Sequence, residues 1–148
     1  MPAGGAGKTQ PLIPAVAGLT AACKKGGADL GDKYANAWAS IEAHCVEAKQ
    51  DPHVENILSR LRMMLNAIGK DDTLSGLKAD ELMKLEECVR KTISRLTTPE
   101  LEGLPADFPH RKFARWLAKT SRKACVEIFT VNYDVLFEHA LEDRKSVV

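Results

Sequence analysis

Residues 124–142 read ACVEIFTVNYDVLFEHALE, and the apolar period of this stretch changes near its middle. The first part, 126–129, is short and rich in β-branched and aromatic residues, which is typical of a largely buried strand. The last part places Val135, Leu136 and Leu141 near helical spacing. Residues 130–134 are therefore predicted to form a corner between a strand and a helix.

Four segments upstream carry apolar residues at helical spacing. The pattern over 12–23 is weak and ends in KKGG at 24–27, the basic last turn and glycine stop expected of a helix end. Stronger stripes predict helices over about 33–49, 54–68 and 79–96. The second of these follows an Asp-Pro pair suited to a helix start.

A fifth helix is predicted over HRKFARWLAKTSRK, residues 110–123, with Phe113, Trp116 and Leu117 as its buried stripe. Its other face is basic. The basic residues are Arg111, Lys112, Arg115, Lys119, Arg122 and Lys123. A solvated amphipathic helix explains them better than contact with nucleic acid, because no aromatic residues alternate with the charges on that face.

The predicted strand needs neighbours, because an unpaired buried strand leaves its N–H and C=O groups without partners. The favoured interpretation is a helix-rich α/β fold with few strands, one partial domain spanning 1–148. Residues 1–10 are expected to be a flexible glycine-rich start, and 144–148 a truncated end where another strand should begin.

The totals exclude several classes of protein. A chain of 148 residues with 45% hydrophobic composition suffices for one folded domain, and its formal charge of +1 creates no global field for nucleic acid or an acidic membrane. The four cysteines form no C-x-x-C pair, so we expect reduced, mostly buried thiols and no metal site. Without a long apolar stretch or a signal peptide, a cytoplasmic protein that does not bind membranes is predicted.

The glycine-rich start contains GGAGKT, which invites comparison with a phosphate-binding loop. The motif G-x-x-x-x-G-K-[ST] would need glycine at position 2, where Pro2 stands, and a preceding strand. A nucleotide triphosphatase is therefore disfavoured. Two interpretations of this segment remain: a flexible terminus, or a glycine loop of another kind than the one found in nucleotide triphosphatases.

The corner at 130–134 also has two interpretations. Asn132 and Asp134 are good capping and first-turn residues for a helix, a purely structural role. Alternatively, the corner lies at the carboxyl end of a parallel strand, where open α/β sheets bind their ligands.

The residues of this corner resemble a known signature. IFTVNYDVLFEHALE is similar to the strand-turn-helix signature of sirtuin-like NAD-hydrolysing domains, in which T-T-N-Y-D precedes a helix with L-x-E-x-A-L. The matching residues are Thr130, Asn132, Tyr133, Asp134, Leu136, Glu138, Ala140 and Leu141. The segment before the strand also resembles that family, so the likeness covers about 108–143.

The resemblance implies a partial Rossmann-like domain with NAD as its substrate. It places Asn132 beside the nicotinamide ribose, where it is needed for cleavage of the glycosidic bond, and gives Asp134 a role in the pocket. It also counts Thr130 and Tyr133 among the residues that contact NAD. The parent enzyme would hydrolyse NAD to nicotinamide and ADP-ribose, and analogy suggests a role in anti-phage defence.

The family also opens with a G-A-G-x-[ST] loop that holds the dinucleotide phosphates. Gly5, Gly7 and Thr9 would belong to that loop.

Three departures from the family pattern matter. Val131 replaces the second threonine, His139 does not match the catalytic histidine, and the isolated cysteines cannot form a four-cysteine zinc module. The matching residues therefore supply no general base, which cleavage of the glycosidic bond requires. The rival hypothesis is a non-catalytic helical interaction module in which the corner is only a cap; self-association stays open under both.

Overall fold

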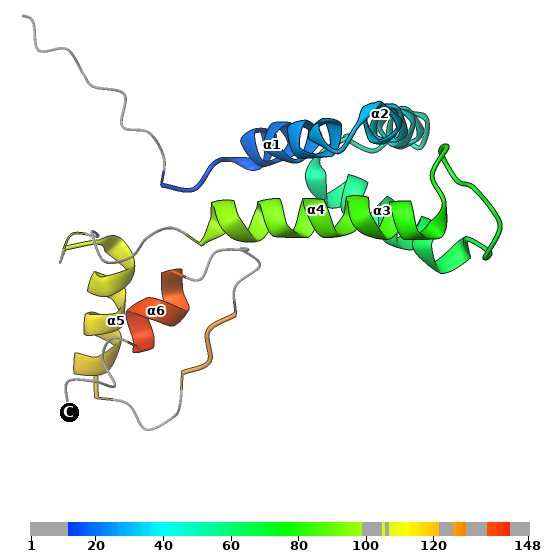
Figure 1. Cartoon of the computed structure of the whole chain (residues 1–148). Helices are drawn as coiled ribbons and strands as arrows, with labels where there is room; N and C mark the ends of the chain where they lie inside the picture. The colour runs from blue at the N-terminus through cyan, green and yellow to red at the C-terminus, as the bar shows by residue number, and fades with distance from the viewer. Residues whose placement is uncertain (1–11, 99–104, 106, 122–125, 130–135, 143–148) are drawn as a thin grey trace, which may run out of the picture.

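The regular secondary structure of the described residues consists of α-helices and no sheet. The computed structural model describes residues 12–98, 105, 107–121, 126–129 and 136–142. Within these residues lie six helices (Figure 1). They are α1 (Val16–Asp29), α2 (Asp32–Glu47), α3 (Val54–Ala67), α4 (Ala79–Thr97), α5 (Pro109–Lys119) and α6 (Leu136–Glu142).

The predicted α/β fold is wrong for the described residues. Among them the β-type pairing is limited to one isolated antiparallel bridge, between Leu74 and Leu77, and no sheet forms. Residues 126–129, predicted to be a buried strand, have no regular structure, and Val126 and Phe129 expose 46% and 87% of their surface. A strand depends on a neighbour that completes its hydrogen bonds, and the described residues contain none.

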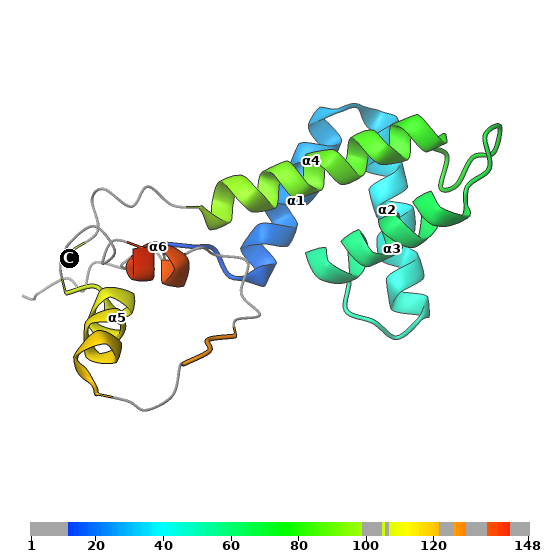
Figure 2. The same cartoon turned by 90° about the horizontal axis from the view of Figure 1, so that it is seen from below.

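Helices α1 to α4 pack around one core. Figure 1 shows α1 and α4 side by side and running in opposite directions, and Figure 2 shows α2 and α3 against them at one end. Helix α1 contacts α2, α3 and α4, and α3 also contacts α4. The buried residues of this core are Leu19, Cys23, Tyr34, Ala37, Trp38, Ile41, Cys45, Val54, Ile57, Leu58, Leu61, Leu77, Leu82, Leu85, Val89 and Ile93.

The predicted helices over 33–49, 54–68 and 79–96 are confirmed within two residues at each end by α2, α3 and α4. The start of α3 differs in detail, because His53 rather than Asp51 occupies its N-cap. Helix α4 begins with a local cap in which the backbone N–H of Lys78 donates to Glu81 Oε2 at 3.0 Å. Glu81 also forms an ion pair with Lys33, which joins the start of α4 to α2.

The predicted glycine stop of the first helix is wrong. Helix α1 continues through Gly26 and Gly27 to Asp29. A Cβ atom at Gly26 would lie 3.3 Å from Cys88 Sγ, and one at Gly27 would lie 3.2 Å from Leu85 Cδ1. Because larger residues would crowd α4, these glycines serve the close approach of two helices rather than the end of one.

Helices α5 and α6 pack against each other. The predicted helix at 110–123 is confirmed over most of its length, but its predicted buried stripe is not. Trp116 is 58% exposed and Phe113 36% exposed, whereas Ala114 is buried. The predicted helix after the corner is confirmed by α6, which buries Leu136 and Ala140.

Candidate functional site

The predicted NAD-binding residues lie outside the residues that the structure describes. This holds for the corner residues Thr130, Asn132, Tyr133 and Asp134 and for the loop residues Gly5, Gly7 and Thr9. The structure therefore neither brings these seven residues together nor separates them. What it describes are the two helices that flank the corner in sequence.

An aromatic cluster joins those two helices. The ring of Phe137 on α6 packs edge-on against His110 at 4.5 Å and against Phe113 at 5.6 Å between ring centroids. His110 also stacks on Phe108 at 5.0 Å. These contacts hold the first half of α5 against the start of α6.

His110 is the histidine with the most unusual surroundings among those described. Its Nδ1 atom is buried and has no hydrogen-bond partner within the described residues, although aromatic rings contact the imidazole on two sides. The sequence alone predicts a solvated or capping role for this residue, because no Cys, Asp or His lies at metal-ligand spacing from it. The sequence does contain aromatic residues at 108, 113 and 137, but it does not show that they gather near His110. The packing of α5 on α6 brings them together.

The other histidines form no catalytic group within the described residues. His44 and His139 are exposed, and His53 lies at the start of α3, where Asn56 Nδ2 is 3.4 Å from its Nε2. No group of three His, Cys, Asp or Glu side chains in the described part of the chain is arranged to hold a metal ion.

The basic face of α5 is partly confirmed. Lys112, Arg115 and Lys119 are exposed and Arg111 is half-buried, while the other two predicted members lie outside the described residues. Lys112 Nζ lies 3.6 Å from Asp107 Oδ2, so part of this charge is balanced locally.

The thiols follow the prediction where they are described. Cys23 and Cys45 are buried and Cys88 is half-buried, and all three are free. Burial raises the pKa of Cys23 to about 11 and also raises the pKa of Cys45. Cys23 Sγ lies 3.9 Å from the carbonyl oxygen of Val89, so its thiol faces the backbone of α4.

None of the helices, over their described residues, combines the length and apolar character needed to cross a membrane.

Comparison of the chain with models of known protein families, with curated proteins and with solved structures finds no match.

Proposed function

We propose that this chain recognises NAD through the corner at 130–134, with Asn132 as the central residue. The observation that carries the proposal is the run of matches to the sirtuin-like signature, from Thr130 through Asp134 and on into the L-x-E-x-A-L helix. Such a run exceeds what helix capping requires, because a cap needs one or two oxygen-bearing side chains rather than a series of matches over twelve residues.

Two described features support the proposal. The segments that the resemblance expects to be helical on either side are α5 and α6. These helices are held together by the contacts of Phe137 with His110 and Phe113. The absence of a strand at 126–129 counts against the sheet that the family would supply, so the proposal rests on the residues of the corner and its flanking helices.

The chemistry assigned to the corner is limited. An amide at Asn132 can hold a ribose hydroxyl or an attacking water while positive charge develops at the ribose carbon. Asp134 would contribute to the same pocket. Cleavage of the bond to nicotinamide also needs a positioned base, and the exposed His139 does not match that role. We therefore expect binding of NAD by this chain and slow hydrolysis at most.

The direct functional test is release of nicotinamide from NAD by the purified chain. Any turnover should disappear in Asn132→Ala and persist in Asn36→Ala, a matched change at an exposed residue of α2. Equal rates in the wild type and Asn132→Ala would remove Asn132 from the mechanism.

The second candidate is a non-catalytic helical interaction module, and one described surface favours it. Trp116 and Phe113 lie side by side on α5, with 5.7 Å between ring centroids, and both are exposed to solvent. Exposed tryptophan on a helix is characteristic of protein contact sites. A second copy of the chain is the simplest occupant of this surface.

Sedimentation over a range of concentrations tests this candidate. Self-association through α5 predicts a dimer that Trp116→Lys abolishes and that Met83→Lys, a change at an exposed methionine of α4, leaves intact. A monomer at every concentration, or a dimer that survives Trp116→Lys, would exclude it.

A further inference from the structure

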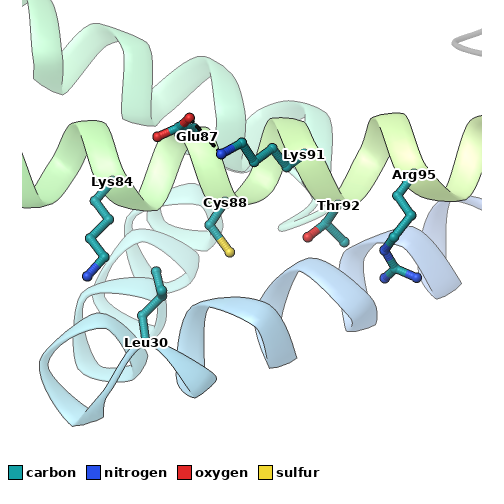
Figure 3. Close-up of a pocket in the computed structure, with 7 residues that line it drawn as sticks. All are labelled: Leu30, Lys84, Glu87, Cys88, Lys91, Thr92 and Arg95. Carbon is teal, nitrogen blue, oxygen red and sulfur yellow. Dashed lines mark ion pairs between the residues drawn. The ribbon is translucent and has the colours of Figure 1, made fainter.

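A groove lies between α4 and the end of α1 (Figure 3). Its volume is about 370 Å³, which falls within the range of pockets that hold small molecules. The lining residues are Leu30, Lys84, Glu87, Cys88, Lys91, Thr92 and Arg95. All except Leu30 belong to α4, so one helix face determines the character of the groove.

The side chains of that face are ordered along the groove. In Figure 3, Cys88, Thr92 and Arg95 point from α4 toward α1, and Lys84 lies on the same side of α4, next to the junction of α1 and α2. This common direction is expected for residues spaced three and four apart. Gly26 of α1 lies opposite the middle of this row, since a Cβ atom there would be 3.3 Å from Cys88 Sγ and 3.5 Å from Thr92 Oγ1. A thiol and a hydroxyl therefore occupy the centre, with a cation at either end.

The charges of the groove are unbalanced. Glu87 Oε1 pairs with Lys91 Nζ at 2.9 Å, so these two lining residues neutralise each other. Neither Lys84 nor Arg95 forms an ion pair with any described residue. Lys84 instead lies over the ring of Tyr34, with its Nζ 5.7 Å from the ring centroid. Two positive charges thus remain available to an anion.

The two ends of the groove are not equivalent. Leu30 lies at the C-terminal end of α1, where the helix dipole presents partial negative charge and disfavours an anion. It also offers an apolar contact beside Cys88. An anionic group is better placed toward Arg95, whose guanidinium can donate two parallel hydrogen bonds to a phosphate.

We propose that this groove is a binding site for a small organic phosphate, specifically a phosphate monoester with an apolar body. The phosphate lies at Arg95 and the apolar body lies over Thr92 and Cys88 toward Leu30. This site is separate from the proposed NAD corner, because every residue that forms it belongs to α1, α4 or the residue that follows α1.

Binding in the groove can be measured through the reactivity of the Cys88 thiol. It is the partly exposed member of the three cysteines that the structure describes, and its thiol lies in the groove. The probe is phenyl phosphate, and the measurement is the rate at which iodoacetamide alkylates Cys88 in the native chain, followed by peptide mass spectrometry. Phenyl phosphate should slow alkylation to a saturating limit, and phenol or inorganic phosphate at equal concentration should slow it less.

Two substitutions with the same charge change locate the effect. Arg95→Gln should abolish the protection, whereas Arg90→Gln should retain it, because Arg90 on the same helix pairs with Glu86 at 2.9 Å and does not line this groove. Asn132→Ala should also retain it, which separates failure of this proposal from failure of the NAD proposal. No protection at about 10 mM phenyl phosphate, or equal protection in Arg95→Gln, overturns the site.

A second measurement does not depend on the affinity of the probe. Iodoacetate is anionic and iodoacetamide neutral, so the ratio of their rates at Cys88 reports the local potential. Removing the charge of Arg95 or Lys84 should lower this ratio by about threefold at low salt. A ratio that both variants leave unchanged contradicts the proposed role of the two cations, and circular dichroism establishes that each variant is folded.

Discussion

Gly27 of α1 lies directly against Leu85 of α4, so that a Cβ atom at Gly27 would come within 3.2 Å of Leu85 Cδ1. Leu85 is fully buried, and Trp38 also lies near the same Cβ position, with its Cε3 atom 3.7 Å away. A methyl group at this point of the helix therefore fits only if Leu85 shifts by a few tenths of an ångström.

This contact predicts opposite outcomes for two adjacent substitutions. Replacing a helical glycine by alanine favours the helix by about 1 kcal/mol. At Gly27 the crowding of Leu85 should outweigh this gain, since overpacking costs about 1–3 kcal/mol. At Gly26 the half-buried Cys88 can rotate away, so Gly26→Ala should be neutral or stabilising. Urea unfolding of both variants checks the order, and a more stable Gly27→Ala would show that the interface can yield.

The burial of side chains in the core of α1 to α4 leads to a second prediction, on the free energy of unfolding. Ile41 is fully buried on α2, whereas Val46 on the same helix is 62% exposed. Ile41→Ala should lower the free energy of unfolding by about 2–5 kcal/mol, because it leaves a cavity. Val46→Ala should change it by less than about 0.5 kcal/mol. Similar losses for the two variants would place the helix in a different orientation from the one described.

The cap of α4 predicts a dependence of stability on pH. Hydrogen bonds from Lys33 and from the backbone of Lys78 hold the pKa of Glu81 below its ordinary value of 4.5. A carboxylate with a lowered pKa contributes stability above its unfolded-state pKa, and this contribution is lost as the pH falls through the folded-state value. The wild type should therefore lose more stability on acidification below about pH 5 than Glu81→Gln does.

Thermal unfolding at several pH values measures this difference. Glu55→Gln is the control, because Glu55 is exposed on α3 and has no ion pair with any described residue. If Glu81→Gln and Glu55→Gln follow the same pH profile, the cap of α4 does not contribute to acid sensitivity.

The thiols should differ in reactivity. With a pKa raised to about 11 by burial, roughly a thousandth of Cys23 is thiolate at pH 8, and the side chain is inaccessible as well. Cys88 should therefore react with N-ethylmaleimide much faster than Cys23 or Cys45 in the native chain. Peptide mass spectrometry at successive times resolves the three sites, and all three should react at similar rates in urea. Rapid labelling of Cys23 without denaturant would mean that α1 separates readily from α4.

Local sequence pattern predicts this fold where packing agrees with it. The apolar stripes through Ile41, Leu61 and Val89 predict α2, α3 and α4 because each helix buries one face in the shared core. The same reasoning fails at Gly26 and Gly27, since a glycine pair signals a helix end locally, while the approach of α4 decides its actual use.

Two other predictions from the sequence are wrong for the same reason, because tertiary packing rather than local pattern decides the outcome. The apolar run at 126–129 has the composition of a strand, but a strand also requires a partner, and composition does not reveal whether one is present. The stripe of α5 was correctly assigned to a helix, but Trp116 remains exposed because a periodic pattern does not specify what covers it. The proposed NAD residues lie outside the described residues, so the structure does not test them. The groove at Cys88 could not be predicted from local sequence, because it forms between two helices that are distant in sequence.

Recognition of NAD by the corner containing Asn132 is tested most directly by a titration followed by nuclear magnetic resonance. In the isotope-labelled chain, NAD at up to about 5 mM should shift the backbone and side-chain amide signals of residues 130–134 in a saturable manner. Asn36→Ala should preserve these shifts and Asn132→Ala should remove them. Unchanged signals from 130–134 at about 5 mM NAD, or identical shifts in Asn132→Ala, would show that this corner does not recognise NAD.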